Sequence, residues 1–356
     1  MYHYAHIGNL RSYIMEDMLE KALRYLGYDV TRAMNITDVG HLSSDADTGE
    51  DKMLKGARRE HKTVMQIAQF YTDAFFSDCE KLGIKRPEIV VPATSCIDTF
   101  IHMVEVLLEK GYAYIAGGNV YFDTSKLENY YVFGNMEEES LAVGVRDSVE
   151  EDENKRSKSD FVLWFTKSKF DDQELKWDSP WGVGYPGWHI ECSAMARKHL
   201  GKTIDLHAGG QDLIFPHHEN EIAQSECANG CTFSRYWMHN GFLNINNEKM
   251  SKSANNFFTV REIADKYGYE PIRYFMLTAG YRMPLNYTVE LIESCKNSLE
   301  RMYTCRDNLD FAIEHAHGTD TALVEKCAEA RKKFKAAMDD DLNTPDALAA
   351  IFDLVK

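Results

Sequence analysis

Three residues with metal-binding side chains lie in one stretch of the sequence, between residues 187 and 227. His217 and Glu221 are four apart and follow Pro216, a residue well suited to the first turn of a helix. That spacing places the imidazole and the carboxylate on one helix face. With Cys192 upstream, the set of thiolate, imidazole and carboxylate suits Zn²⁺. The same residues also fit a core cysteine beside a solvated helix, so both interpretations stay open on this pattern alone.

Two further stretches carry residues suited to binding phosphate. His6, Gly8 and Asn9 stand where an aromatic segment turns into a helix, and glycine there lets a ligand approach the backbone at a helix N-terminus. The run KMSKS at 249–253 follows a strand and a tight turn at Asn246-Asn247. Its lysines and hydroxyls suit a polyphosphate whose charge grows during transfer. A plain helix start and a solvated basic loop are the alternatives.

Strands alternate with helices up to about residue 280. The expected helices cover 10–26, 60–82 and 96–110, and the expected strands cover 29–36, 88–91, 161–165, 203–212 and 236–243. From Val260 onward the pattern is helical, with interruptions near 280–286, 317–319 and 339–344. This order predicts an α/β domain with a parallel sheet over 1–280, then an α-helical bundle over 281–356. An acidic insertion without period occupies 134–160.

A G-x-G-x-x-G match occurs at Gly182, Gly184 and Gly187. A dinucleotide site needs a strand before this motif and a helix that opens on its glycines. Here WDSPW precedes the motif and Pro186 interrupts it, so we do not interpret it as a cofactor site.

Composition limits the classes of protein that this chain can represent. With 356 residues, 44% of them hydrophobic, it can bury a sizeable core in two domains. It has no apolar run of ~18 residues and no signal-peptide pattern, and its eight irregularly spaced cysteines indicate thiols in a reducing compartment. We therefore expect a cytoplasmic protein without a membrane partner. A net charge of −16 argues against a sequence-blind nucleic-acid binder, although local basic patches could hold one RNA.

Taken together, these motifs resemble the cysteinyl-tRNA synthetase family of class I aminoacyl-tRNA synthetases. HIGN at 6–9 is similar to the HIGH signature of that class, with Asn9 in place of the second histidine, and KMSKS is its other signature. NITD at 35–38, GWHIECSAM at 187–195 and GGQDLIFPHHENE at 209–221 resemble blocks of the cysteine-specific family. The resemblance extends from His6 to about Pro345 and implies a Rossmann-like catalytic domain, with an insertion at about 95–180, before the helical domain.

The resemblance also implies roles for individual residues. Positions that match the family's ATP-binding residues are His6, Gly8, Asn9, Gly209, Asp212, Lys249 and Lys252. Those implied to be catalytic are His6, Asn9, Lys249 and Lys252. Thr37 and Trp188 match positions that close around the cysteine substrate. Cys192, His217 and Glu221 match zinc ligands, and the family's fourth ligand is a cysteine on its first strand.

The implied reaction joins L-cysteine to tRNA(Cys) at the expense of ATP, which enters with Mg²⁺. The reaction would be accelerated by the positioning of the substrates and by electrostatic stabilisation of the transition state, since no side chain has to act as a nucleophile. One Zn²⁺ per chain would take the substrate thiolate as a ligand, whereas the hydroxyl of serine is a poorer ligand. A site of this kind can discriminate against the wrong substrate by a factor of ~10⁴–10⁵ in kcat/KM. We expect a monomer.

Two other functions use the same core. One is a ligase that joins activated cysteine to an amino sugar in mycothiol synthesis, and the other is a non-catalytic remnant that binds nucleotide or RNA. The family's Cys-Gly-Pro-Thr block, which carries the fourth zinc ligand, would fall before Met1. We therefore expect the coding sequence upstream of Met1 to encode, in frame, a short apolar strand that ends in this block. We likewise expect the helical domain to stop short of the family's C-terminal part.

Overall fold

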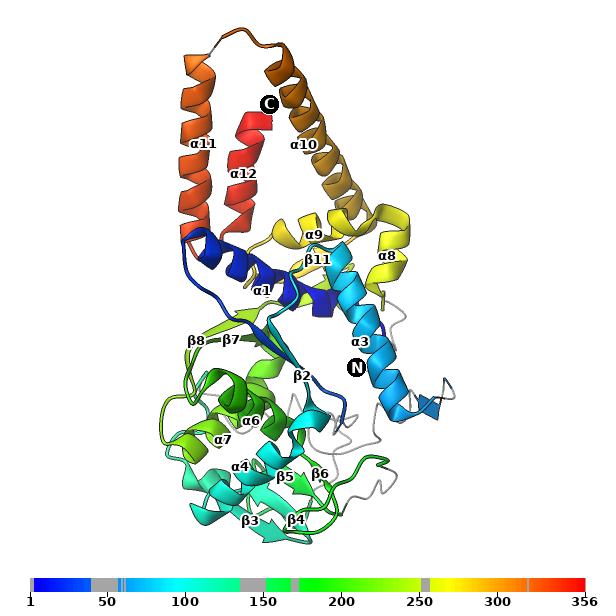
Figure 1. Ribbon diagram of the computed structural model, residues 1–356, viewed down its shortest axis with the longest axis vertical. Coiled ribbons are helices and arrows are strands. Elements are labelled where there is room, and N and C mark those ends of the chain that lie inside the picture. Colours follow the sequence, from blue (N-terminus) through cyan, green and yellow to red (C-terminus); the bar gives the residue numbers. More distant parts are fainter. Residues whose placement is uncertain are drawn as a thin grey trace.

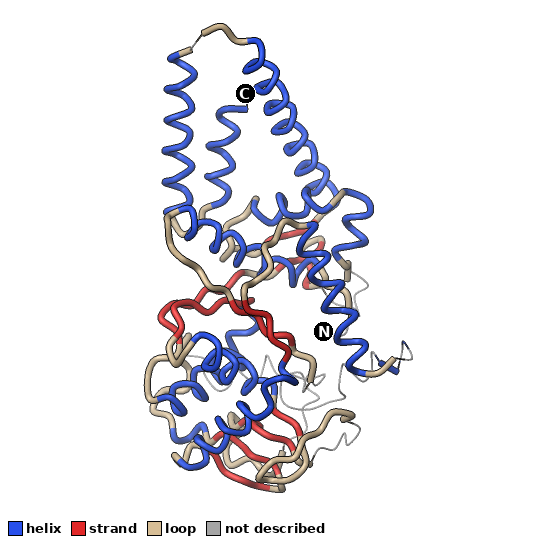
Figure 2. Tube along the Cα trace, viewed as in Figure 1, coloured by secondary structure: helices blue, strands red, loops and turns tan. Residues whose placement is uncertain are grey.

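The computed structural model describes residues 3–39, 57–58, 60, 62–134, 152–167, 173–250, 257–318 and 320–355. Figures 1 and 2 show an elongated molecule: an insertion layer of strands and helices at one end, paired strands with a crossing helix in the middle, and long helices at the other end. No helix within the described ranges is long and apolar enough to cross a membrane.

The middle of the molecule is built from two pairs of parallel strands. β1 (Ala33–Ile36) pairs with β2 (Ile89–Pro92), and β7 (Ile204–Gly210) pairs with β8 (Ser234–Asn240). Helix α1 (Ile7–Tyr25) crosses beside them (Figure 1). Parallel strands joined through helices confirm the predicted α/β class. These four strands form two separate pairs, where the sequence suggested one sheet.

Helix α1 begins at a side-chain cap and ends in a glycine turn. His6 Nδ1 accepts a hydrogen bond of 3.2 Å from the backbone N–H of Asn9, which satisfies one of the free amides of the first turn. Gly27 follows the helix with φ of 90°, a conformation that glycine adopts readily. The buried side of α1 contributes Ile7, Leu10 and Ile14 to a core shared with the helices of the C-terminal half.

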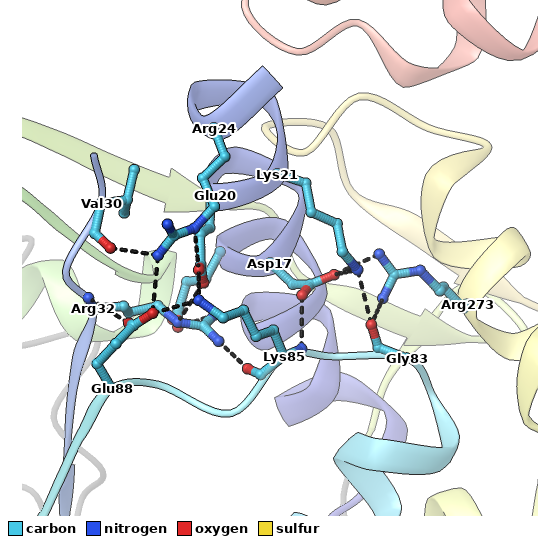
Figure 3. A network of polar contacts seen from close by, with 11 residues as sticks. Asp17, Glu20, Lys21, Arg24, Val30, Arg32, Gly83, Lys85, Glu88 and Arg273 are labelled. Carbon is cyan, nitrogen blue, oxygen red and sulfur yellow. Dashed lines mark hydrogen bonds and ion pairs between the residues drawn. The ribbon is translucent and has the colours of Figure 1, made fainter. Parts of the chain in front are cut away.

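A network of buried charges fixes α1 to its neighbours (Figure 3). The Asp17 side chain is fully buried and accepts hydrogen bonds from Lys21 Nζ at 2.6 Å, Arg273 Nη2 at 2.6 Å and the Lys85 backbone N–H at 2.8 Å. One turn on, Glu20 forms ion pairs with the side chains of Arg24, Arg32 and Lys85. Burial alone would raise the pKa of Asp17, but the hydrogen bonds from Lys21 and Lys85 and the charge of Arg273 outweigh it and lower that pKa. Through Arg32, just before β1, and Arg273, in the helical region, the network holds both segments against α1.

The insertion forms an antiparallel sheet covered by helices on one face (Figure 1). Its strands are β3 (Ala113–Ala116), β4 (Asn119–Phe122), β5 (Phe161–Phe165) and β6 (Tyr185–Pro186). The helices and turns around it are η1 (Ala93–Cys96), α4 (Ile97–Glu109), η2 (Thr124–Lys126), α6 (Trp188–Leu200) and α7 (Glu219–Asn229). Helix α3 (Val64–Lys81) packs instead in the core that α1 shares with the helices of the C-terminal half. The apolar side chains of α4, β4, β5 and α6 form one core, which positions α6 and α7 beside the paired strands.

The glycines of the G-x-G-x-x-G match serve backbone packing. A Cβ on Gly184 would lie 1.9 Å from the carbonyl oxygen of Phe165, and one on Gly187 would lie 2.1 Å from that of Val162. Both positions therefore need glycine because β5 passes close by. No cofactor has to be invoked to explain the motif.

Helices dominate the C-terminal third, as the sequence predicted. They are α8 (Val260–Tyr267), α9 (Tyr269–Leu277), α10 (Val289–His315), α11 (Thr321–Asp339) and α12 (Thr344–Val355). A short strand that the sequence pattern missed, β11 (Leu285–Tyr287), pairs in parallel with β9 (Leu243–Ile245), which also forms a hairpin with β10 (Glu248–Lys249). The expected turn between β9 and β10 is present, with positive φ at Asn246 and Asn247. The domain boundary after residue 280 stays a prediction.

Candidate functional site

The three predicted metal ligands come together from two helical segments. Cys192 lies on α6, His217 in the wide turn η4 (Ile214–His218), and Glu221 in the first turn of α7. Their ligand atoms all lie within 4.8 Å of one another, and His217 Nε2 is 3.7 Å from Glu221 Oε1. The chain enters α7 through η4, so His217 precedes the regular helix, but the spacing of four still brings the two side chains together.

Two histidines that the sequence analysis did not single out hold these ligands in place. His189 Nδ1 and His217 Nδ1 share a hydrogen bond of 2.8 Å, and the other ring nitrogen of His217, Nε2, faces Glu221. His207 Nε2 lies 2.8 Å from Glu221 Oε2, which leaves Oε1 as the oxygen near the other ligands. Metal-binding histidines and carboxylates usually have such partners. No local spacing could have revealed them, because their positions depend on how α6 and β7 approach α7.

The residues present fit a zinc ion. Glu221 Oε1 is buried and has no hydrogen-bond partner within the described residues. Burial of such a carboxylate oxygen costs free energy unless the oxygen binds a cation. Burial and the charges of Glu221 and Glu191 raise the pKa of the Cys192 thiol well above its usual value, so only a strong positive charge would make it a thiolate. Sulfur, nitrogen and oxygen donors of these three kinds are the ligands by which proteins hold Zn²⁺.

A second group of possible ligands shares one of these residues. His207, His218 and Glu221 also place ligand atoms within 4.8 Å of one another. In that group, however, Glu221 Oε2 is already paired with His207, and His218 Nδ1 is 2.8 Å from His239 Nε2. Burial lowers the pKa of His218 to about 2, so that ring is neutral. The free oxygen of Glu221 therefore favours the group that contains Cys192.

The predicted substrate residues line the accessible side of this group. Trp188 stacks on His217 with ring centroids 4.3 Å apart, and Thr37 follows the end of β1. Trp188, Thr37 and Cys192 are each partly exposed, whereas His217 and Glu221 are buried. The partly exposed residues of the group are therefore those that the resemblance assigns to the substrate, together with Cys192.

A short segment of the insertion closes the opposite side of α7. The Glu219 carboxylate accepts hydrogen bonds of 3.0 Å from the backbone N–H groups of Val132 and Phe133. Phe133 also packs edge-on against His239, with ring centroids 5.2 Å apart. The insertion thereby covers the histidines behind the ligands and keeps them in fixed orientations.

The HIGN motif occupies the first turn of α1, as predicted. Its His6 caps the helix, pairs with Thr259 through a backbone bridge and packs edge-on against Phe257, with ring centroids 5.1 Å apart. Asn9 is exposed, and Gly8 is half-buried. A side chain on Gly8 would stand 3.0 Å from Met250 Cε, so the KMSKS segment begins directly beside the HIGN motif.

The KMSKS run is described only at its first two residues, Lys249 and Met250. Lys249 ends β10, although its side chain lies outside the described residues, and Lys252 lies in the stretch 251–256, which is also outside them. After that stretch, Thr259 and Glu262 form a capping box at the start of α8, with hydrogen bonds of 3.3 Å and 2.7 Å. Both flanks of the run are therefore anchored next to α1.

The glycine turn after β7 faces the same helix. A Cβ on Gly209 would lie 2.8 Å from the His218 ring, and one on Gly210 would lie 2.3 Å from Asp212 Oδ1 and 3.9 Å from Ser12 Oγ on α1. Asp212 itself is exposed. The turn thus lies between the histidine cluster and the first turns of α1, which is consistent with the predicted nucleotide contact.

Arg11 is a residue of the site that the sequence analysis missed. Its buried guanidinium donates hydrogen bonds to five backbone carbonyls, those of Gly241, Phe242, Gly280, Tyr281 and Met283. Burial lowers its pKa to about 10, so it stays charged at neutral pH. Arg11 therefore ties α1 to the chain on either side of the hairpin that carries Lys249. Its partners are more than 200 positions away, so no sequence spacing could point to them.

Comparison with known proteins gives two family models and many relatives. The model described as tRNA synthetases class I (C) catalytic domain matches residues 1–297, and the DALR domain model matches residues 333–356. A cysteine--tRNA ligase of Clostridioides difficile is 47% identical over 361 residues, covering 100% of this chain and 74% of the relative. One of Treponema denticola is 48% identical over 373 residues, covering 100% of this chain and 75% of the relative.

Among solved structures, a Mycobacterium tuberculosis methionyl-tRNA synthetase in complex with methionyl-adenylate superposes with a TM-score of 0.68. It shares 17% identity, and the match covers 99% of this chain and 80% of that one. At this identity the likeness concerns the fold alone.

Proposed function

Because this chain belongs to the class I aminoacyl-tRNA synthetase family that contains the cysteine--tRNA ligases, we propose that it activates L-cysteine with ATP and transfers it to tRNA(Cys). The single observation that carries the substrate assignment is the group of Cys192, His217 and Glu221. It combines a buried carboxylate oxygen that has no hydrogen-bond partner within the described residues with the sulfur of a partly exposed cysteine. Such a group suits a ligand that can add a second sulfur to a metal ion.

In the first step, a carboxylate oxygen of cysteine attacks the α-phosphorus of ATP, the bond to the bridging oxygen breaks, and pyrophosphate leaves. Negative charge grows on the leaving group, so fixed positive groups accelerate the step. His6 and Asn9 at the start of α1, with Lys249 and Lys252, are proposed to bind this charge, and Mg²⁺ enters with ATP. Arg11 supports the step by holding the β9–β10 hairpin against α1.

In the second step, a hydroxyl of the terminal tRNA ribose attacks the carbonyl carbon of the adenylate, and AMP leaves. The binding of both substrates in one orientation supplies most of the rate, since no covalent enzyme intermediate is needed. Gly209 and Asp212, in the turn beside α1, are proposed to hold the nucleotide ribose. Thr37 and Trp188 are proposed to orient the cysteine.

Cys192, His217 and Glu221 would hold one Zn²⁺, and that ion supplies selectivity by binding a thiolate in preference to a hydroxyl. His189 keeps one nitrogen of His217 occupied, and His207 keeps one oxygen of Glu221 occupied. These two histidines therefore fix which ligand atoms point inward. A cytoplasmic monomer with one zinc ion is part of this proposal.

The relatives do not favour the other two functions considered from the sequence. Those reported above are cysteine--tRNA ligases at 47–48% identity over the whole chain, which argues against both the amino-sugar acceptor and a remnant without activity.

A charging assay tests the proposal. The protein is incubated with radiolabelled cysteine, ATP, Mg²⁺ and a tRNA(Cys) transcript, and acid-precipitable label is counted. We expect label that mild base removes, because the product is an ester. A matched transcript with a periodate-oxidised terminal ribose should take up none. Equal labelling of both transcripts, or transfer to an amino sugar in place of tRNA, would contradict the assignment.

A further inference from the structure

Asn35 connects the candidate metal ligand to the candidate substrate pocket. It lies on β1, where it is paired in register with Val91 of β2, so its backbone position is fixed. Its side-chain Nδ2 is 3.5 Å from Cys192 Sγ and 3.3 Å from Thr37 Oγ1. A carboxamide has two N–H donors, so it can serve both neighbours at once. Asn35 thus places an N–H donor at this sulfur.

This contact has a chemical consequence once Cys192 is a metal ligand. A thiolate that accepts an N–H bond has its lone-pair electrons stabilised and gives less charge to the metal. The metal is then a better acceptor for a second sulfur, the one that a cysteine substrate brings. Glu221, a neighbouring ligand, is a carboxylate and offers the sulfur no N–H group, whereas the Asn35 amide lies within hydrogen-bond distance of it.

The second hydrogen bond fixes the substrate side. Thr37 Oγ1 accepts from Asn35, so the hydroxyl proton of Thr37 points away from the amide. Thr37 is only partly buried, and this bond favours one of its side-chain rotamers. The same amide thus orders the sulfur and the hydroxyl that flank the opening of the pocket.

We propose that Asn35 is a positioning and specificity-determining residue: its carboxamide donates one N–H to the Cys192 thiolate and the other to the Thr37 hydroxyl, and so couples the metal to the cysteine pocket. This inference rests on the proposed function, since it requires that Cys192 binds a metal ion. Asn35 would act through Cys192 and Thr37 and would not itself bind the metal ion.

Cobalt spectroscopy of the full chain tests the proposal. Zinc is removed, Co²⁺ is added, and the thiolate-to-cobalt absorption is recorded without any amino acid for the wild type, Asn35→Asp, Asn35→Leu and Thr37→Val. Loss of the N–H donor raises the energy of the sulfur lone pair, so both Asn35 variants should show the band at longer wavelength. Thr37→Val keeps the contact to sulfur, so its band should not move. Zinc affinity, measured by competition with a chromogenic chelator, should fall about 10- to 100-fold in Asn35→Leu, because the N–H bond that stabilises the thiolate over the thiol is lost without any added charge.

The outcomes separate this inference from the proposed function. A wild-type band that the Asn35 variants leave in place, together with an unchanged zinc affinity, would overturn the role of Asn35 and leave the metal site intact. The absence of any thiolate band in the wild type would overturn the metal site and this inference with it. Asn35→Asp keeps the side-chain volume, so a shift there cannot be attributed to lost packing. Thermal melting of each variant identifies any that fail to fold.

Discussion

Met250 fills the space beside Gly8 that a side chain would need, with its Cε 3.0 Å from the position of a Gly8 Cβ. The two residues belong to motifs far apart in the sequence, HIGN and KMSKS, and their contact brings the motifs to one place at the start of α1. The nucleotide site proposed here depends on this contact.

Gly8→Ala should therefore slow cysteine activation without unfolding the protein. The added methyl group would lie 3.0 Å from Met250 Cε and 3.1 Å from His6 Nδ1, so one of them must move away from the phosphates. We expect a loss of about tenfold in kcat/KM for ATP in pyrophosphate exchange, as for a small misplacement of a binding group. Gly280→Ala, which meets no atom within 4 Å, is the matched control. Equal activity of the two variants would show that the contact is unimportant.

Lys252→Ala should reduce the rate of activation about 10²–10³-fold, because one charge that stabilises the departing pyrophosphate is lost. ATP binding should change much less, since that charge grows only during the reaction. Single-turnover kinetics separate the two quantities. Lys326→Ala on the exposed face of α11 is a control for the loss of one positive charge. If KM rises while kcat stays unchanged, Lys252 acts in binding only.

Cobalt in place of zinc should report the binding of the substrate thiol. When cysteine is added to the cobalt protein, we expect additional thiolate-to-cobalt absorption, because a second sulfur joins that of Cys192. Serine at the same concentration should add none. Glu221→Gln should weaken metal binding and the response together. A response of equal size to both amino acids would rule out selection by the metal.

Much of this site could be predicted from residue types and local spacing. His217 and Glu221 are four apart, and Asn246-Asn247 forms the tight turn that leads to Lys249. These features depend on a few neighbouring residues, so the sequence shows them directly. The strand 203–212 and the helix 10–26 were likewise expected and correspond to β7 and α1.

The residues that support the ligands could not be predicted in this way. His189, His207 and Asn35 contact the metal ligands only because α6, β7 and β1 pack against one another. In the sequence, Arg11 cannot be distinguished from the other charged residues of its helix. Its role depends on the folded chain, in which residues 241 and 283 lie beside α1. Strand β11 was missed because its three residues pair with β9, about 40 positions earlier.

Asp17 should control stability at low pH. Its pKa is lower in the folded protein than in the unfolded chain, so its contribution is complete above the unfolded pKa of ~3.9 and is lost as the pH falls through the folded pKa. Asp17→Asn leaves Arg273 without its buried partner and should lower the free energy of unfolding by about 3 kcal/mol at pH 7. Urea titrations at pH 7 and at pH 3 should show that this difference shrinks at the lower pH. Asp307→Asn, at an exposed ion pair, should change little at either pH.

The central claim, that this chain activates cysteine and selects it by its thiol, is tested most directly by ATP–pyrophosphate exchange. The assay compares cysteine with serine, in protein loaded with zinc and in protein treated with a chelator. The account predicts exchange that depends on cysteine, exceeds that with serine by ~10⁴, and is lost on chelation and restored by zinc. Exchange at similar rates with both amino acids, or exchange with cysteine that survives removal of the metal, would contradict it.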